Sequence, residues 1–163
     1  MRLWYAALPF GILVTASPRH EPGPTEQVSV RGAWQVLTMS LTTGEQTTRN
    51  VSPQPGLVLF TERHYSLMYV EGAAARKMFS DPARPTDAEK LDAYETFVGH
   101  SGTYAVADSI IAMSVVVAKL PNLTGPELRN TFARFAYERR GDTLRLTRRS
   151  PRAVFTMLLL RVE

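Results

Sequence analysis

Residues 110–117, a run rich in isoleucine and valine, lie between two short motifs and constrain the fold more than any other segment. Ser-Gly-Thr-Tyr at residues 101–104 precedes the run, and Pro-Asn-Leu-Thr-Gly at residues 121–125 follows it. Because β-branched side chains favour strands over helices, the run predicts a long apolar strand. A strand, a turn, a second strand and a Pro-Asn-x-x-Gly corner are typical of an antiparallel barrel.

Most of the remaining chain consists of short alternating segments separated by turn residues, a pattern that indicates half-buried strands. Further strands are predicted at residues 28–41, 45–51, 56–60, 65–70, 128–138, 143–147 and 153–162. The length of 163 residues fits one domain of this kind. The predicted fold class is therefore all-β: an eight- to nine-stranded antiparallel barrel with one short helix.

The one predicted helix covers residues 86–98. Thr86 and Glu89 have the spacing of a capping box, in which each side chain bonds the backbone of the other. Apolar side chains follow at helical spacing: Leu91, Tyr94, Phe97 and Val98. We expect this helix to precede the Ser-Gly-Thr-Tyr strand directly.

The first 27 residues differ in composition from the rest. Arg2 precedes an uncharged apolar stretch, residues 3–16, which ends in small residues. This pattern is typical of a secretory signal peptide, and the stretch is shorter than the roughly 20 residues of a membrane span. Residues 1–16 are thus a predicted signal peptide for secretion or transport to the periplasm. Residues 17–27 form a Pro- and Gly-containing linker, and residues 28–163 form the barrel domain.

Cysteine is absent, and the C-terminal quarter is rich in arginine. The absence of cysteine excludes disulfides and thiolate chemistry. Between residues 128 and 163 there are nine arginines against three acidic residues. Such an excess could attract an anionic partner, or the arginines could simply alternate along strands and face solvent.

Several of these motifs together resemble the bacterial lipocalin-like domain family over most of residues 31–163. They are Gly32-Ala33-Trp34, Pro55-Gly56-Leu57, Tyr94 with Gly99-x-Ser-Gly-Thr-Tyr104, Pro121-Asn122-x-x-Gly125 with Arg129, Gly141-Asp142-x-Leu144-x-Leu146, and Arg161. The resemblance implies a calycin-type barrel that binds a small, largely apolar molecule. Members often carry a histidine before the Pro-Asn corner, where this chain has Ala112-Met113-Ser114. No role of that histidine can therefore be transferred.

The resemblance also implies that Trp34 is a plug at one end of the barrel. A cation above its ring would add a cation–π contact, and either Arg161 or Arg129 could supply it. Alternation from Trp34 and along the strands predicts the residues that line the interior and bind the ligand: Trp34, Val36, Tyr65, Leu67, Tyr104, Phe132 and Arg134. Arg134 could pair with a ligand carboxylate, or it could face water while the interior is filled. A purely structural role is also open for Trp34 and Tyr104.

Catalytic and metal-binding signals are weak. His20, His64 and His100 do not have metal-ligand spacing, so we expect no metal and no cofactor. The leading functional hypothesis is an exported barrel that binds a small hydrophobic or amphipathic molecule. The alternative is a cofactor-free isomerase or cyclase that uses Tyr104 with His100 or Glu138. A third reading is an interaction module with an arginine-rich face. Neither nucleic-acid binding nor an integral membrane span is expected.

Overall fold

A computed structural model describes residues 29–50, 54–125 and 133–163, which form nine strands and one α-helix. The strands are β1 (Gly32–Thr43), β2 (Gln46–Asn50), β3 (Gly56–Phe60), β4 (His64–Val70), β5 (Phe97–Ala107), β6 (Ile110–Ala118), β7 (Ala133–Arg140), β8 (Thr143–Arg149) and β9 (Ala153–Arg161), and the helix is α1 (Asp87–Glu95). The predicted all-β fold class is confirmed. The predicted leader and linker lie outside the described residues.

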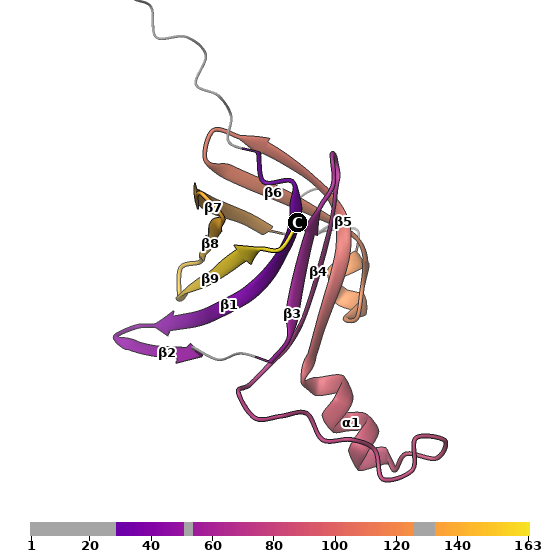
Figure 1. Ribbon diagram of the computed structural model, residues 1–163. Helices are drawn as coiled ribbons and strands as arrows, with labels where there is room; N and C mark the ends of the chain where they lie inside the picture. Colours follow the sequence, from indigo (N-terminus) through magenta and orange to yellow (C-terminus); the bar gives the residue numbers. More distant parts are fainter. Residues whose placement is uncertain (1–28, 51–53, 126–132) are drawn as a thin grey trace, which may run out of the picture.

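The strands close into an antiparallel barrel because β1 pairs along both of its edges. One edge pairs with β9 along nearly its whole length, while the other pairs first with β3 and then with β2. Eight strands, β1 and β3–β9, therefore form the closed barrel, and β2 extends one side of it. Figure 1 shows the long, curved β1 that connects these two parts. Closure removes the exposed strand edges that an open sheet would leave.

Alternation of side chains fills the interior. In β8, Leu144 and Leu146 are buried while Arg145 between them is exposed. In β1 the alternation changes phase, because the register with β9 shifts between Val36 and Thr38. This bulge is the reason that Val36 and Met39, three positions apart, are both buried in the core.

The Ser-Gly-Thr-Tyr motif is part of the barrel wall. The register of β5 with β6 shifts between Ser101 and Gly102, which marks a second bulge. A Cβ atom on Gly102 would lie 1.9 Å from the backbone oxygen of Ser114, so a side chain does not fit there. The Pro-Asn motif that follows β6 forms a short 3₁₀ helix, Pro121–Thr124. Both motifs thus have a structural explanation.

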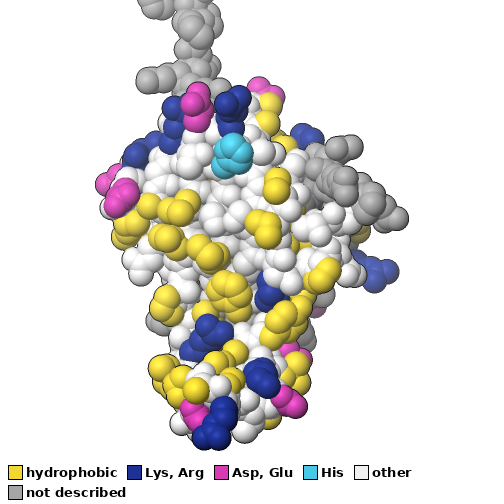
Figure 2. All heavy atoms as spheres, turned by 90° about the vertical axis from the view of Figure 1, so that its right-hand side faces the viewer, with side chains coloured by type: hydrophobic (Ala, Val, Ile, Leu, Met, Phe, Trp, Pro, Cys, Tyr) yellow, Lys and Arg dark blue, Asp and Glu magenta, His cyan; other side chains and the backbone are white. Residues whose placement is uncertain are grey.

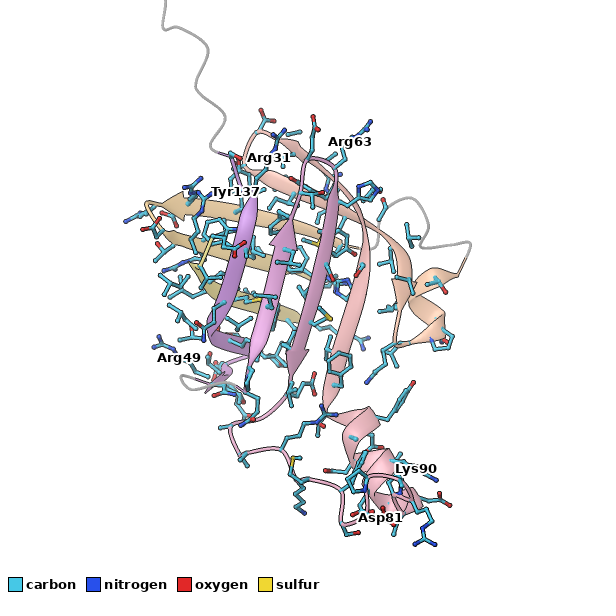
Figure 3. All side chains as sticks on the ribbon, turned by 45° about the vertical axis from the view of Figure 1, so that its right-hand side comes forward. Arg31, Arg49, Arg63, Asp81, Lys90 and Tyr137 are labelled. Atoms are coloured by element: carbon cyan, nitrogen blue, oxygen red, sulfur yellow. The ribbon has the colours of Figure 1, made fainter. Side chains whose placement is uncertain are left out.

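The connection between β4 and β5, residues 71–96, forms an arm that projects from one end of the barrel (Figures 1 and 3). Asp81 and Lys90, labelled in Figure 3, lie in it. The capping box at Thr86 and Glu89 is confirmed, and hydrogen bonds from Ser80 and Thr86 lower the pKa of Glu89 to about 2. The helix ends at Glu95 rather than at residue 98, because Phe97 and Val98 pair with β4 as the start of β5.

Candidate functional site

The end of the barrel at which β1 begins is closed by Trp34, whose side chain is fully buried. Its indole Nε1 donates a hydrogen bond of 2.8 Å to the backbone oxygen of Val30. The guanidinium carbons of Arg139 and Arg161 lie 5.6 Å and 5.8 Å from the centre of the indole ring. Both distances fit a cation–π contact. We call Val30, Trp34, Arg139 and Arg161 the plug.

The structure identifies the arginines that contact Trp34, which the sequence alone left open. Arg161 is one of the two arginines expected near Trp34, whereas Arg129, the other, lies outside the described residues. Arg139 was not foreseen in this place. The middle of the barrel below the plug is filled by fully buried side chains: Val58, Ile111, Met113, Leu144, Leu146, Met157 and Leu159. A ligand would therefore have to enter from the opposite end.

The opposite end is less tightly packed. We call the inward-facing positions there the mouth; they are Met39 of β1, Tyr69 of β4, Val98 of β5, Arg148 of β8 and Phe155 of β9. Tyr69, Val98 and Phe155 are only partly buried against the core. A hollow of about 400 Å³ opens beside Met39, Tyr69 and Phe155, at the small end of the range for ligand pockets.

Loop residues form the outer side of this hollow. The side-chain amide of Asn50 donates a hydrogen bond of 3.0 Å to the backbone oxygen of Gly72, and Gln54 donates one of 3.1 Å to Ala73. These bonds hold the start of the arm against the end of β2. Glu71 and Gly72 are consequently fixed at the rim of the hollow.

A hydrogen-bonded pair, Tyr65 and His100, lies just inside the mouth. The Tyr65 hydroxyl and His100 Nδ1 are 2.9 Å apart, and the two rings meet edge to face with centroids separated by 5.5 Å. His100 is 8% exposed and Tyr65 is 2% exposed, so both polar groups are buried. A polar group in an otherwise apolar interior can orient a bound molecule.

Burial determines the charge state of this pair. Desolvation, assisted by the positive charge of Arg148, lowers the pKa of His100 to about 4. Desolvation raises the pKa of Tyr65 to about 12. Both side chains are therefore neutral near pH 7. The pair offers hydrogen-bonding capacity without a net charge.

Arg148 belongs to the same region. It follows Leu144 and Leu146 at two-residue spacing, and both leucines point into the barrel. In the register of β8 with β9, Arg148 lies opposite Phe155 of the mouth. Its effect on His100, which is on a strand across the barrel, fits a side chain that points inward. Arg148 is nevertheless exposed, because β8 ends where the barrel opens.

Six of the seven predicted lining residues fall into three groups. Trp34, Val36, Tyr65 and Leu67 all belong to the interior core, as the alternation predicted. Tyr104 lies at the edge of that core, where its hydroxyl donates a hydrogen bond of 2.7 Å to the Thr61 oxygen. Phe132 lies outside the described residues. Contact of any of these residues with a ligand stays a prediction.

Arg134 requires a correction. The sequence pattern placed it inside with Phe132, but Ala133 and Phe135 are the buried residues of β7, and Arg134 is exposed on the outer face. The pattern was ambiguous because both sets of alternating positions in the predicted strand 128–138 contain apolar residues. An arginine that could meet a ligand carboxylate inside the barrel is supplied by β8 instead.

The residues considered for the catalytic alternative are not brought together. His100 is the fourth residue of β5, and its partner is Tyr65 rather than Tyr104. The Tyr104 hydroxyl is bound to Thr61, and Glu138 is exposed and accepts a 2.7 Å hydrogen bond from Arg140. Alternation back from Gly102 along β5 would have placed His100 inside. The expectation that the helix continued to residue 98 hid that signal.

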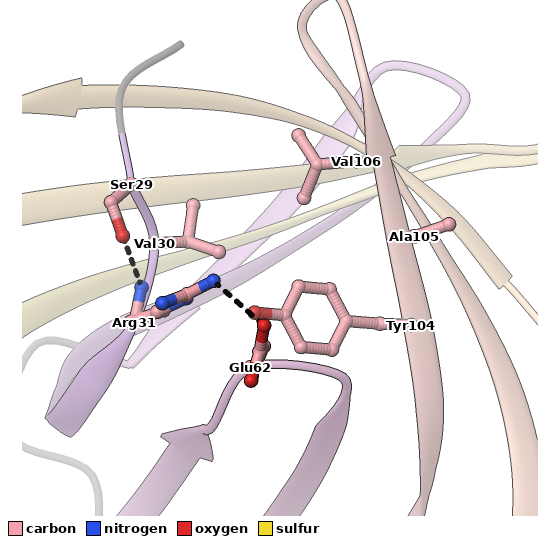
Figure 4. A pocket seen from close by; sticks show the side chains of 7 residues that line it. All are labelled: Ser29, Val30, Arg31, Glu62, Tyr104, Ala105 and Val106. Atoms are coloured by element: carbon pink, nitrogen blue, oxygen red, sulfur yellow. Dashed lines mark hydrogen bonds and ion pairs between the residues drawn. The ribbon is translucent and has the colours of Figure 1, made fainter.

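A second hollow of about 400 Å³ lies outside the plug (Figure 4). Arg31 and Glu62 approach within 3.8 Å across it, with the Tyr104 ring beside them. Both charged side chains are more than half exposed, so their attraction contributes at most about 1 kcal/mol. Because Val30 and Trp34 are buried beneath it, this is a surface cleft and does not lead into the interior.

The outer face of the sheet carries some exposed apolar side chains (Figure 2). Met68 and Phe97 are shared by two shallow hollows of about 400 Å³ and 330 Å³ on β3–β6. The described ranges contain no group of three or more histidine and acidic side chains that could hold a metal ion. They also contain no helix with the length and apolar character to cross a membrane.

Comparisons with known proteins place the chain in a family. A family model for a lipocalin-like domain matches residues 31–154. A lipocalin-like protein of known structure from Bacteroides uniformis is 12% identical, with 80% of this chain and 96% of that chain covered and a TM-score of 0.43. An uncharacterized protein from Bacteroides eggerthii is 10% identical, with 80% and 98% covered and a TM-score of 0.41. A search of curated proteins gives no match. Since the family model covers most of the barrel, the chain belongs to the family of lipocalin-like domains.

Proposed function

We propose that this protein binds a small hydrophobic or amphipathic molecule through the mouth of its barrel. The observation that carries the proposal is the contrast in packing along the barrel axis. One end is filled around Trp34, whereas the other has partly buried aromatic residues beside a hollow of about 400 Å³. Apolar walls with a few polar groups are typical of ligand pockets.

Binding explains the Tyr65–His100 pair better than catalysis does. A general acid or base works best when its pKa lies near the working pH. With a pKa of about 4, His100 is a weak base at neutral pH, and Tyr65, with a pKa of about 12, is a weak acid. These values suit hydrogen bonding to a ligand. They favour the binding barrel over a cofactor-free isomerase or cyclase.

Displacement of a fluorescent fatty acid from the purified barrel tests the proposal. Phe155→Asn replaces the apolar ring in the mouth by a polar amide without adding a charge, and we expect it to weaken binding at least about tenfold, since one apolar side chain buried against the ligand contributes more than about 1.4 kcal/mol. Val154→Asn, on the outer face of the same strand, is the matched control and should bind like the parent protein. Absence of binding by the parent protein at high micromolar ligand would contradict the proposal.

We further propose that residues 1–16 are removed during export. The support is the pattern of Arg2, the apolar stretch and the small residues before Ser17. Mass spectrometry of the full chain expressed in a bacterial host should find a periplasmic product that begins at Ser17. Leu8→Asp, which places a charge in the apolar stretch, should block processing. A cytoplasmic product that retains residues 1–16 would refute export.

A further inference from the structure

Near the mouth, strands β4, β5 and β8 contribute polar groups to a lining that is otherwise apolar among the described residues. His100 and Tyr65 form the buried pair, and Arg148 is the cationic residue on the inward-facing side of β8. Arg148 lies opposite Phe155, which lines the hollow together with Met39 and Leu41, among others. Apolar and cationic surfaces therefore meet at the mouth.

Charge is unevenly distributed around the mouth. Glu71 lies at the rim of the hollow beside Tyr69, where its charge helps to raise the pKa of that tyrosine. Arg148 lies on another strand, opposite Phe155. A ligand with one anionic end is repelled near Glu71 and attracted near Arg148. The two charges thus favour one orientation of such a ligand.

The apolar lining of the hollow and the cationic Arg148 together match the chemistry of an amphipathic carboxylate. A guanidinium binds a carboxylate through two parallel hydrogen bonds, and partial desolvation strengthens that contact. His100 and Tyr65 lie near enough to the same region to add uncharged hydrogen-bonding groups. The hollow of about 400 Å³ suits a short alkyl or small ring system rather than a large lipid.

We propose that the barrel selects small amphipathic carboxylates, with the carboxylate bound by Arg148 and the apolar part held against Met39 and Phe155. The inference rests on the proposed binding function and adds the ligand class and its anchoring residue. It replaces Arg134, the arginine that the sequence pattern had indicated, with a residue on the neighbouring strand.

Two probes of equal chain length, decanoate and decanamide, separate this inference from the proposed function. At pH 7.4 the parent protein should bind decanoate at least about tenfold more tightly, as expected for a hydrogen bond to a charged group. Arg148→Met should reduce the preference to less than about twofold, whereas Arg148→Lys, which keeps the charge, should retain part of it. Isothermal titration calorimetry provides the affinities.

Arg149→Met is the matched control. It removes the same charge from the next residue of β8, which faces outward, and should leave the preference unchanged. Equal affinity of the parent protein for the two probes, or equal effects of Arg148→Met and Arg149→Met, overturns the inference and leaves the binding function intact. Failure of both probes to bind overturns the proposed function and this inference together. Circular dichroism establishes that each variant is folded.

Discussion

The two ends of this barrel are built from the same alternating strands but have opposite properties. At the plug, Trp34 is fully buried and contacts two guanidinium groups, and the side chains below it are also fully buried. At the mouth, aromatic side chains are only partly buried and polar groups face inward. The difference separates the tightly packed end of the barrel from the end at which we propose binding. Four predictions test that separation, in order of decreasing effect.

The largest expected effect comes from a pair of large-to-small substitutions, one at each end. Trp34→Ala should lower the free energy of unfolding by about 4 kcal/mol, because it leaves a cavity in a packed region. Tyr69→Ala at the mouth should cost about 1 kcal/mol, since that ring is only partly buried. Urea denaturation measures both values. Equal losses would show that the two ends do not differ in packing.

The second prediction concerns pH. His100 has a pKa of about 4 in the folded protein and an ordinary value of 6.5 when unfolded. Between these values the unfolded chain binds more protons, so acidification from pH 6.5 to pH 4 destabilises the fold. At about 1.4 kcal/mol per pH unit, the loss approaches 3 kcal/mol.

The matched measurement is the unfolding free energy of His100→Gln over the same pH range. Glutamine does not titrate, so this variant should lose less stability than the parent protein as the pH falls. Carboxylates titrate in both proteins, and the difference between the two curves isolates His100. Identical pH dependence would place His100 in contact with water rather than inside the mouth.

The third prediction addresses the wall between the two ends. Gly102→Ala places a methyl group against the backbone of Ser114, and the bulge must shift to accept it. We expect a loss of about 2 kcal/mol, as for other overpacked positions. Gly44→Ala is a useful contrast, because its Cβ would meet nothing within 4 Å and only the positive φ of 59° opposes it. A smaller loss at Gly102 than at Gly44 would contradict the close approach.

The smallest expected effect is at the arginines of the plug. Arg139→Gln should cost about 1 kcal/mol, because a cation–π contact to Trp34 is lost. Arg145→Gln, on the exposed outer face of β8, should cost less than about 0.5 kcal/mol. Thermal denaturation of the two variants compares them directly. Equal costs would indicate that the cations do not stabilise the plug.

Much of the fold followed from local pattern. Turn residues and two-residue alternation predicted nearly all the strands, and the capping box predicted the start of α1. The end of α1 was misjudged, because Phe97 and Val98 continue the helical spacing but pair with β4. Local spacing does not reveal a competing partner strand. Long-range hydrogen bonding therefore decided that boundary.

The candidate site was predicted less completely. Trp34, Val36, Tyr65 and Leu67 were correctly placed inside, since each lies in a strand with one clearly apolar face. The prediction for Arg134 is wrong because the sequence of the predicted strand 128–138 has apolar residues in both alternating sets. Met39 could not be predicted from Trp34 by simple alternation, because the bulge after Val36 changes the phase. A single inserted residue reverses the face of the sheet to which every later side chain in the strand points.

The sequence by itself determined the strands and their antiparallel arrangement, because these depend on local propensity and alternation, and its resemblance to the lipocalin-like family indicated Trp34 as the plug residue. Only the tertiary structure decided which arginines contact Trp34, which residue binds His100 and which residues remain partly buried at the edge of the core. Those features depend on contacts between strands far apart in the chain. Tyr65 and His100 are 35 residues apart, and their hydrogen bond exists because β4 and β5 are adjacent in the barrel.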